Sequence, residues 1–259
     1  MSNSLFDLTG KVAVITGSTK GIGRAIAEAM ARAGAKVVIS SRKAEACDEV
    51  AAAIRAEGHE ASAIPCHIGK RADVENLVAE TRRKYGKIDV LVCNAAVNPV
   101  YGPMSQLTDD AFGKVIDSNV RSTLWLCNLV LPEMAERKEG SVIIVSSIGG
   151  LKGSHNLGIY AISKAADFQL ARNLAVEWGR YNIRANCIAP GVVRTDFAKA
   201  LWENPDILRK TEAATPLGRV GVPEDIAGAA VFLAASASSW MTGQTIVIDG
   251  GVTIAGGEV

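Results

Sequence analysis

The stretch KVAVITGSTKGIG, residues 11–23, decides the fold, because it joins an apolar, β-branched strand to an amphipathic helix through a turn that holds three glycines. Glycines allow a tight turn and let a ligand come close to the backbone. The start of the helix offers free N–H groups and the positive end of its dipole to an anion. This order of elements predicts a doubly wound α/β fold with a pyrophosphate-binding turn. The turn residues expected to contact the nucleotide are Gly17, Ser18, Thr19, Lys20, Gly21, Ile22 and Gly23.

The rest of the chain alternates between short apolar runs and longer Ala-rich stretches up to about residue 250. Such alternation predicts a parallel sheet with helices on both faces. The expected strands are 11–16, 36–40, 61–66, 88–94, 141–146, 183–189 and 245–249, and the expected helices are 22–33, 43–57, 70–84, 108–137, 158–180 and 223–235. No linker or repeat divides the chain, so residues 1–259 are expected to form a single domain around a seven-stranded parallel sheet.

Residues 195–216 are the most irregular part of the chain, because Asn204-Pro205-Asp206 interrupts a stretch that contains Phe197, Leu201 and Trp202. In a doubly wound sheet, an excursion beyond the carboxyl end of a strand is where a substrate wall lies. We expect a mobile substrate flap here. An ordinary pair of surface helices fits the pattern equally well.

Composition and charge argue against several classes of protein. The 28 Lys+Arg and 27 Asp+Glu residues give a formal net charge of +1, so no nucleic acid partner is expected. The chain has no apolar run of about 18 residues, and its N-terminus lacks the pattern of a signal peptide, so we expect a cytoplasmic protein without a membrane segment. The five cysteines are scattered and the three histidines lack ligand spacing, so neither a disulfide framework nor a metal site is expected.

Tyr160 and Lys164 stand at positions i and i+4 of one predicted helix, so their side chains share a face. A nearby ammonium lowers the pKa of a phenol from about 10 toward the working pH. Tyr160 would then act as a general acid when a ketone is reduced and as a general base when an alcohol is oxidised. Because Tyr/Lys pairs are common on exposed helices, this assignment depends on the motifs around it.

The Gly-x-x-x-Gly-x-Gly spacing of the first turn resembles that of the short-chain dehydrogenase/reductase family, whose members have a Rossmann fold, and the resemblance continues along the whole chain. Ala96 departs from the family pattern, which usually has glycine there. The other matching motifs are Asn94-Ala95-Ala96, Asn119, Ser147, Tyr160-x-x-x-Lys164 and Pro190-Gly191-x-x-x-Thr195.

The resemblance implies a catalytic set of Asn119, Ser147, Tyr160 and Lys164. Ser147 is expected to hold the substrate oxygen, and Lys164 to bind the nicotinamide ribose as well. Asn119 is expected to anchor a water molecule that relays protons from Lys164. Tyr160 and Lys164 are thereby also cofactor contacts, and further contacts with the cofactor are implied for Asn94, Ala95, Pro190, Gly191, Val193 and Thr195.

The end of the second predicted strand, Ser40-Ser41-Arg42-Lys43, indicates which nicotinamide cofactor is preferred. An Asp at this point would accept hydrogen bonds from both ribose hydroxyls and repel a 2′-phosphate. Here Arg42 can pair with that phosphate and Ser41 can donate to it, with Lys20 on the same side. We therefore expect NADP(H) rather than NAD(H). His67 and Ile68 stand where many relatives have Asp-Val against the adenine, and His67 could equally be a loop residue with no such role.

Several stretches look most like the NADP-dependent carbonyl reductases and retinol dehydrogenases of the family, which implies a small lipophilic ketone, diketone or alcohol as substrate. These stretches are 38–43, 65–70, 94–99 and Leu201-Trp202. The alternatives are a 3-oxoacyl-thioester reductase of fatty-acid metabolism and an NAD-dependent secondary alcohol dehydrogenase. A nucleotide sensor with a silent site is disfavoured because Tyr160 and Lys164 are both present.

Two predicted helices carry apolar residues beyond one face, and a helix of that kind needs a second partner. We therefore expect a homotetramer, which the family forms through these helices and the closing strand. The chain ends in Gly257-Glu258-Val259, so the peroxisomal tripeptide of some animal members is not expected to carry over. The residues that suggest the interface are Leu124, Trp125, Leu129, Phe168, Leu170 and Trp178.

Overall fold

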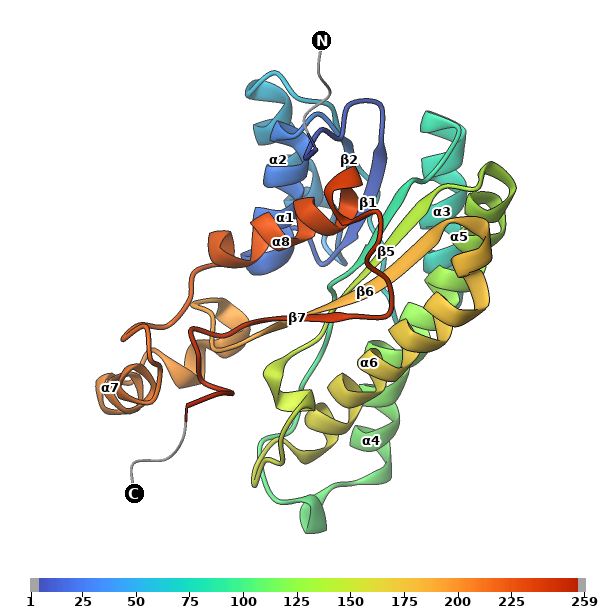
Figure 1. The fold of residues 1–259 in the computed structure, drawn as a ribbon. Coiled ribbons are helices and arrows are strands. Elements are labelled where there is room, and N and C mark those ends of the chain that lie inside the picture. The colour runs from blue at the N-terminus through green and yellow to red at the C-terminus, as the bar shows by residue number, and fades with distance from the viewer. Residues whose placement is uncertain (1–4, 256–259) are drawn as a thin grey trace.

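A computed structural model describes residues 5–255 of the chain. Its strands form one parallel sheet in the order β3-β2-β1-β4-β5-β6-β7, which confirms the predicted doubly wound α/β domain (Figure 1). Residues 1–4 and 256–259 lie outside the described part of the chain. They include terminal residues from which the cellular location was predicted. The strands are β1 Val12–Thr16, β2 Lys36–Ser40, β3 Ala61–Ala63, β4 Val90–Cys93, β5 Gly140–Val145, β6 Ile183–Pro190 and β7 Thr245–Ile248.

Helices cover both faces of the sheet and bury a separate apolar core on each (Figure 1). One face is covered by α1 Gly21–Arg32, α2 Ala44–Ala56 and α8 Pro223–Ala234, and the other by α3 Arg71–Tyr85, α5 Ser122–Arg137 and α6 Gly158–Trp178. The central strands are buried on both sides, which explains why β1 and β5 read as continuous apolar runs. Two shorter helices complete the described fold, α4 Asp109–Ile116 beside α6 and α7 Pro205–Ala213 near the C-terminus.

Three expectations about the elements were wrong in detail. The strand expected over 61–66 ends at Ala63, although the N–H groups of Ile64 and Cys66 still donate to Ile39 O at 3.0 Å and to Ser41 O at 2.9 Å. The helix expected over 108–137 is interrupted by one wider, π-helical turn, Asp117–Arg121, between α4 and α5. Phe168 was counted among the residues that suggest the interface, but it is buried in the core beneath α6, and Trp125, Leu129, Leu170 and Trp178 are partly buried against the same core.

The segment 195–216 is helical. A 3-10 helix, Asp196–Leu201, follows the β6 loop and leads into α7. The interruption in the sequence is the start of α7, where the Asn204 side chain accepts hydrogen bonds from the N–H groups of Asp206 at 2.9 Å and Ile207 at 3.3 Å. Pro205 occupies the first turn, where its missing N–H costs nothing. The segment therefore projects from the carboxyl end of the sheet as two short helices.

Among residues 5–255, no helix is long and apolar enough to cross a membrane. The same residues contain no group of three or more His, Cys, Asp or Glu side chains that could hold a metal ion.

Candidate active site

The glycine-rich turn after β1 is held open by an amide from the neighbouring strand. Asn94, which follows β4, donates from Nδ2 to the carbonyl oxygens of Thr16 at 2.9 Å and Gly17 at 3.2 Å. A Cβ on Gly23 would lie 2.4 Å from that nitrogen, and Gly17 has a φ of +66°. Only residues without a side chain fit at these two positions, so Asn94 and the glycines together fix the shape of the turn.

Ser18 and Ala95 also serve the shape of the turn. The buried Ser18 hydroxyl donates to Ile15 O at 2.7 Å and accepts from the N–H of Ser40 at 2.8 Å, which fastens the turn to the end of β2. The Ala95 N–H donates to the Thr16 hydroxyl at 3.2 Å. Of the predicted nucleotide contacts, the Ser18 and Asn94 side chains are thus engaged with the protein itself.

The start of α1 leaves backbone donors free beside the turn. No side chain caps the start of α1 at Lys20, so the first-turn N–H groups stay available for an anion. The Thr195 methyl group lies 3.0 Å from the place that a Cβ on Gly21 would take, so the β6 loop meets the glycine-rich turn there. The two loops are therefore neighbours at the carboxyl ends of the strands, where doubly wound folds bind nucleotides.

The residues predicted to contact the adenosine part of the cofactor lie near the ends of β2 and β3 and in the turn. Arg42 is exposed and makes no hydrogen bond or ion pair with any of the described residues. Lys20 instead pairs with Asp196 at 2.9 Å, and about two thirds of each side chain is exposed, so solvent weakens this pair. The His67 ring accepts a hydrogen bond from the Gly69 N–H at 3.1 Å, while Ile68 is buried.

The β6 loop packs closely on the end of β7. The Gly191 N–H donates to Ile248 O at 2.9 Å, and a Cβ on Gly191 would lie 2.8 Å from the Asp249 backbone. Val193 is buried, and the Thr195 hydroxyl accepts from the Ala198 N–H to start the next helix. Pro190 is the last residue of β6. The end of β7 therefore supports the predicted nicotinamide segment.

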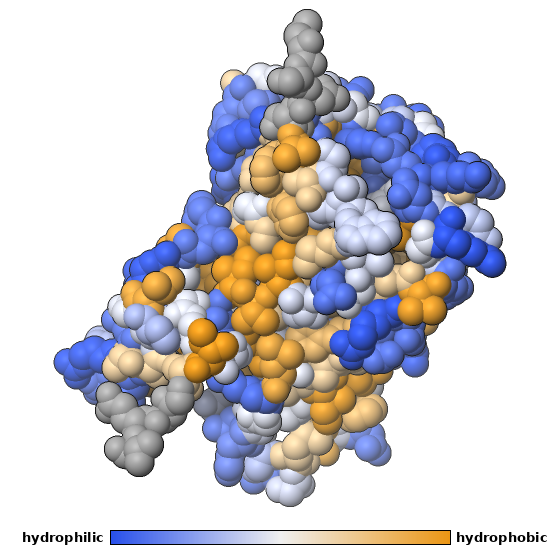
Figure 2. Space-filling model, viewed as in Figure 1, coloured by the Kyte–Doolittle hydropathy of each residue, from blue (hydrophilic) through white to orange (hydrophobic). Residues whose placement is uncertain are grey.

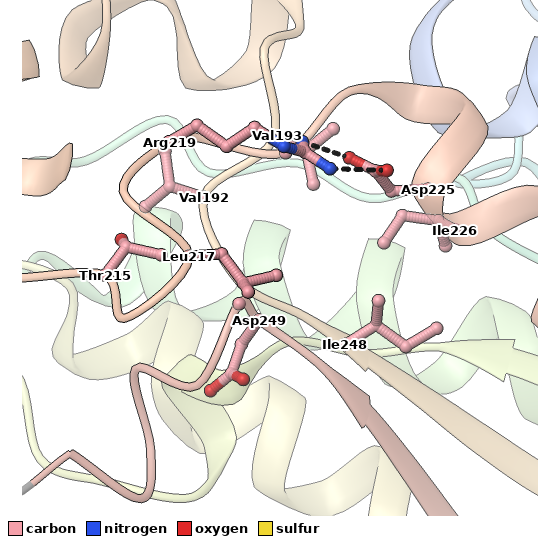
Figure 3. Close-up of a pocket in the computed structure, with 11 residues that line it drawn as sticks. Val192, Val193, Thr215, Leu217, Arg219, Asp225, Ile226, Ile248 and Asp249 are labelled. Carbon is pink, nitrogen blue, oxygen red and sulfur yellow. Dashed lines mark hydrogen bonds and ion pairs between the residues drawn. The ribbon is translucent and has the colours of Figure 1, made fainter.

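A cavity of about 150 Å³ lies behind this segment, between the β6 loop, the start of α8 and the end of β7 (Figure 3). Arg219 and Asp225 bridge its rim with two hydrogen bonds, and these hold the pKa of Asp225 down at about 2. Val193 lines the cavity, but none of the four predicted catalytic residues does. The cavity therefore backs the β6 loop and is separate from the reacting centre.

Ser147 and Tyr160 approach one another around Gly149. Ser147 follows β5, and its hydroxyl accepts the Gly149 N–H at 3.0 Å. A Cβ on Gly149 would lie 3.3 Å from that hydroxyl and 3.8 Å from the edge of the Tyr160 ring. The Phe197 ring lies on the Tyr160 ring, with 5.8 Å between centroids. A hydroxyl and a phenol thus border one small region, walled by an aromatic ring.

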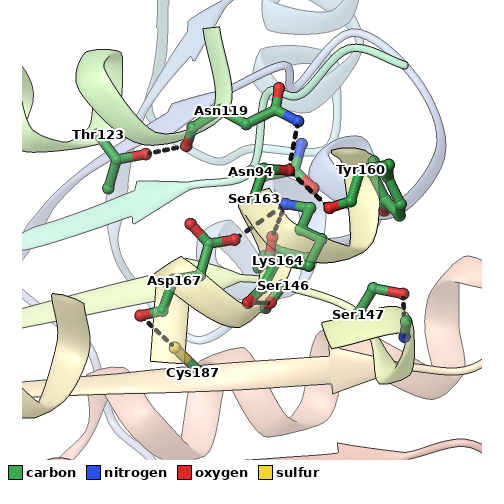
Figure 4. A network of polar contacts seen from close by, with 12 residues as sticks. Asn94, Asn119, Thr123, Ser146, Ser147, Tyr160, Ser163, Lys164, Asp167 and Cys187 are labelled. Atoms are coloured by element: carbon green, nitrogen blue, oxygen red, sulfur yellow. Dashed lines mark hydrogen bonds and ion pairs between the residues drawn. The ribbon is translucent and has the colours of Figure 1, made fainter. Parts of the chain in front are cut away.

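Lys164 lies below Tyr160 and points into the protein (Figure 4). Its Nζ is 5.7 Å from the centre of the Tyr160 ring, donates to Val145 O at 2.9 Å, and pairs with the Asp167 carboxylate at 3.1 Å. Burial alone would lower the pKa of Lys164, but the attraction of Asp167 and Tyr160 outweighs burial and raises it. The ammonium therefore stays charged although only 4% of the side chain is exposed.

Asn119 lies in the π-helical turn and connects two parts of the site. Its amide bonds both polar groups of the Val97 backbone, at 2.8 and 3.0 Å, and donates to the Ser163 hydroxyl at 3.0 Å. Ser163 in turn donates to the Tyr160 carbonyl oxygen at 2.7 Å. The Asn119 side chain thus ties the loop after β4 to the first turn of α6, and π-helical turns of this kind often occur at functional sites.

Sequence reasoning missed Asp167 and Gly150. Asp167 follows Lys164 at i+3, a spacing that brings two helical side chains together, in a stretch that is otherwise apolar. A Cβ on Gly150 would lie 2.6 Å from the Lys164 carbonyl carbon, so this glycine lets the Ser147 segment touch α6. The spacing and polarity of Asp167 could have indicated its role. The role of Gly150 rests on a contact between distant segments, which the sequence does not show.

Comparison with known proteins agrees with this arrangement. A family model described as enoyl-(acyl carrier protein) reductase matches residues 17–253. The chain belongs to the short-chain dehydrogenase/reductase family, and it is an oxidoreductase that uses a nicotinamide cofactor.

Among the relatives, bovine dehydrogenase/reductase SDR family member 4 is 43% identical over 244 residues, which cover 94% of this chain and 88% of the relative. Human dehydrogenase/reductase SDR family member 2, mitochondrial, is 41% identical over 94% of this chain and 86% of its own length. A gluconate 5-dehydrogenase from Burkholderia cenocepacia, solved in complex with NADP and tartrate, superposes with a TM-score of 0.94 at 32% identity, over 99% of this chain and all of that one.

We predict that Gly150→Ala lowers kcat/KM by about 100-fold, because the added methyl group displaces the Ser147 segment from α6 and a shift of about 1 Å can cost that much. Steady-state kinetics would measure the loss. Gly153→Ala is the matched control, since a Cβ there meets nothing within 4 Å. Equal activities of the two variants would contradict the role assigned to the contact.

Proposed function

We propose that the protein is an NADP(H)-dependent oxidoreductase that interconverts a ketone or aldehyde and the corresponding alcohol. The observation that carries the proposal is the convergence of the Ser147 hydroxyl and the Tyr160 ring beside Gly149, above a charged Lys164. In this proposal the two hydroxyl groups donate to a carbonyl oxygen as it gains negative charge during reduction.

In the proposed mechanism, Ser147 orients the substrate. Its oxygen already accepts the Gly149 N–H, and its own proton is donated to none of the described residues, so the proton is free for a substrate oxygen. Tyr160 gives a proton to that oxygen during reduction and removes it during oxidation. The Lys164 ammonium below the ring favours the phenolate. The cofactor, when bound, supplies or accepts the hydride.

We propose two roles for Asn119: it positions the turn that carries Tyr160, and it takes part in proton delivery. Its amide is engaged with Val97 and Ser163, so its side chain sets the position of the Tyr160 turn. The backbone carbonyl oxygen of Asn119 accepts a hydrogen bond from the Thr123 hydroxyl at 3.1 Å and has a second lone pair. A water molecule bound there would relay protons between Lys164 and solvent.

Arg42 and Ser41 support a preference for NADP(H). The guanidinium of Arg42 is unpaired among the described residues and stands at the end of β2, where a ribose 2′-phosphate would lie. Ser41 replaces the carboxylate that would repel this phosphate. Lys20 can add its charge only after it leaves Asp196, and the exposed pair costs little to separate.

The surroundings of Tyr160 favour a lipophilic carbonyl substrate. Exposed apolar side chains gather on the segments that border Tyr160, from the loop before α4 to the helix after β6, and such walls suit uncharged ligands. The resemblance of the sequence to the carbonyl reductases of the family points the same way. The gluconate 5-dehydrogenase is similar in fold, which makes a polyhydroxy acid the contrasting candidate. The apolar side chains are Tyr101, Met104, Leu151 and Phe197.

We also propose that the protein is a homotetramer. Figure 2 shows apolar side chains collected over the middle of one face, where Figure 1 places β7 between α8 and α6. β7 is the edge strand of the sheet, and its apolar residues are only partly buried. Val176 of α6 is 87% exposed and Leu124 of α5 is 40% exposed. An uncovered apolar edge strand invites pairing with another chain.

A cytoplasmic location is proposed as well. One of the relatives is a mitochondrial protein by name, so fractionation of cells is the measurement that decides between the two compartments.

We predict that the wild-type protein reduces aromatic ketones or α-diketones with NADPH, and that Tyr160→Phe lowers this rate by about 100- to 10,000-fold through loss of the general acid. The variant should bind NADPH almost as well as the wild type, as measured by quenching or transfer of protein fluorescence. Tyr181→Phe, which removes a hydroxyl from the 3-10 turn that follows α6, is the control and should keep full activity.

The choice of substrates tests the class. Turnover of an acetoacetyl thioester alone would move the assignment to a 3-oxoacyl-thioester reductase. Oxidation of gluconate with NADP⁺, without turnover of ketones, would favour the polyhydroxy-acid candidate. A Tyr160→Phe variant with unimpaired turnover would overturn the mechanism.

The cofactor preference should reverse in Arg42→Asp, because the substitution removes the partner of the 2′-phosphate and introduces a carboxylate that repels it. We expect the ratio of kcat/KM for NADPH to that for NADH to fall by about tenfold or more. Lys114→Asp makes the same change of charge at an exposed residue of α4, which is distant in sequence from β2, and it should leave the ratio unchanged. An unaltered ratio in Arg42→Asp would remove Arg42 from the cofactor site.

Light scattering after size exclusion should give a mass four times the 27.1 kDa of one chain. Val247→Lys places a charge on the partly exposed edge strand β7 and should lower the mass to that of a dimer or monomer. A wild-type mass of one chain would contradict the proposed assembly.

A further inference from the structure

A buried carboxylate stands next to the proposed active-site lysine. Asp167 lies one turn after Lys164 on α6, its side chain is 1% exposed, and its Oδ2 is 3.1 Å from the Lys164 ammonium (Figure 4). The same ammonium donates to Val145 O at 2.9 Å. Two of the three N–H donors of Lys164 are thus fixed below the Tyr160 ring, and one remains for a ligand.

The fold itself does not need a charge at this position. The neighbouring residues on the buried face of α6 are apolar, and an apolar side chain of similar size would pack there without the cost of removing a carboxylate from water. A buried ion pair is often no more stabilising than apolar residues of the same volume. The presence of Asp167 therefore suggests a role in the reaction. The apolar neighbours are Phe168, Ala171, Leu174 and Ala175.

Few other groups can compensate the ammonium. Among the described residues, the titratable groups that act on the pair are Tyr160 on the same helix, Cys187 on β6 and Cys93 on β4. Burial raises the pKa of the Cys187 thiol, and a hydrogen bond with Cys127 together with burial raises that of Cys93, so both thiols stay neutral. The Cys187 thiol donates only to the backbone oxygen of Asp167, at 3.4 Å.

We propose that Asp167 is a positioning residue that holds the Lys164 ammonium beneath Tyr160 and keeps it charged. The pairing fixes the distance from the ammonium to the phenol and supplies the counter-charge that solvent would supply at the surface. Oδ1 of Asp167 has no hydrogen-bond partner among the described residues, and Oδ2 accepts from Lys164. Burial raises the pKa of the Asp167 carboxyl, and the attraction of Lys164 and the Ser146 hydroxyl oppose that rise.

The direction of the expected pH effect follows from the charges. Burial lowers the pKa of Lys164, and the attraction of Asp167 more than reverses that effect. Without the carboxylate, burial dominates and the lysine loses its proton at a lower pH. A neutral lysine no longer favours the phenolate, so alcohol oxidation should fail earlier as the pH rises.

The experiment compares Asp167→Asn with Glu177→Gln in the full-length protein. Glu177 is an exposed carboxylate on the same helix, so its variant loses the same charge away from the site. The alkaline limb of the pH profile of kcat/KM for alcohol oxidation should move to lower pH by about one to three units in Asp167→Asn, as for loss of a charge within about 4–6 Å. It should stay in place in Glu177→Gln. An active Asp167→Asn whose profile superposes on that of the wild type would overturn the inference.

A second measurement needs neither turnover nor a variant of Asp167. In wild-type protein with ¹³C-labelled lysine, the Lys164 signal, identified by its loss in Lys164→Met, should titrate above the ordinary lysine pKa of about 10.4. Titration at or below that value would overturn the inference. This test remains available if Asp167→Asn fails to fold.

The kinetic arm rests on the proposed function, whereas the titration does not. A wild-type protein that turns over no carbonyl or alcohol would contradict the proposed function, and the Lys164 titration would still decide the role of Asp167.

Discussion

The site depends on β1 being hydrogen-bonded along both edges, to β2 over five residue pairs and to β4 over three. The strand order reverses at this point, which is where doubly wound folds bind their ligands. Ser18 ties the glycine-rich turn to β2, and Asn94 ties it to β4. The shape of the turn therefore depends on the register of three strands.

Buried charge is treated differently at the two ends of the sheet. At the amino end, Asp89 accepts the Val12 N–H at 2.8 Å and pairs with Lys87 and Arg137, both of which keep about a third of their side chains in water. At the carboxyl end, the Lys164 and Asp167 side chains are both nearly inaccessible. The first arrangement joins strands and lets solvent share the charge, whereas the second confines an ion pair to the protein interior, where each charge acts strongly on the other.

The sequence predicted those parts of the structure that depend on local pattern. The apolar runs, the glycine turn and the order of the motifs predicted the sheet, the strand-to-helix turn and the placement of Ser147, Tyr160 and Lys164 near one another. Phe168 and Asp167 were not placed, because α6 is apolar around much of its surface and its sequence alone leaves open which side faces the sheet. The π-helical turn at Asn119 and the contact at Gly150 depend on packing between segments far apart in the chain, which periodicity does not report.

The five cysteines are all buried, and none forms a disulfide. Burial raises the pKa of the Cys66 thiol to about 12, and the pKa values of the Cys93 and Cys187 thiols are raised as well. Because the thiolate is the form that reacts with alkylating reagents, the folded chain should be almost inert toward them. A single cysteine introduced on the helices after β6 would then carry a fluorophore or spin label at one defined point, and the native thiols would not need to be removed first.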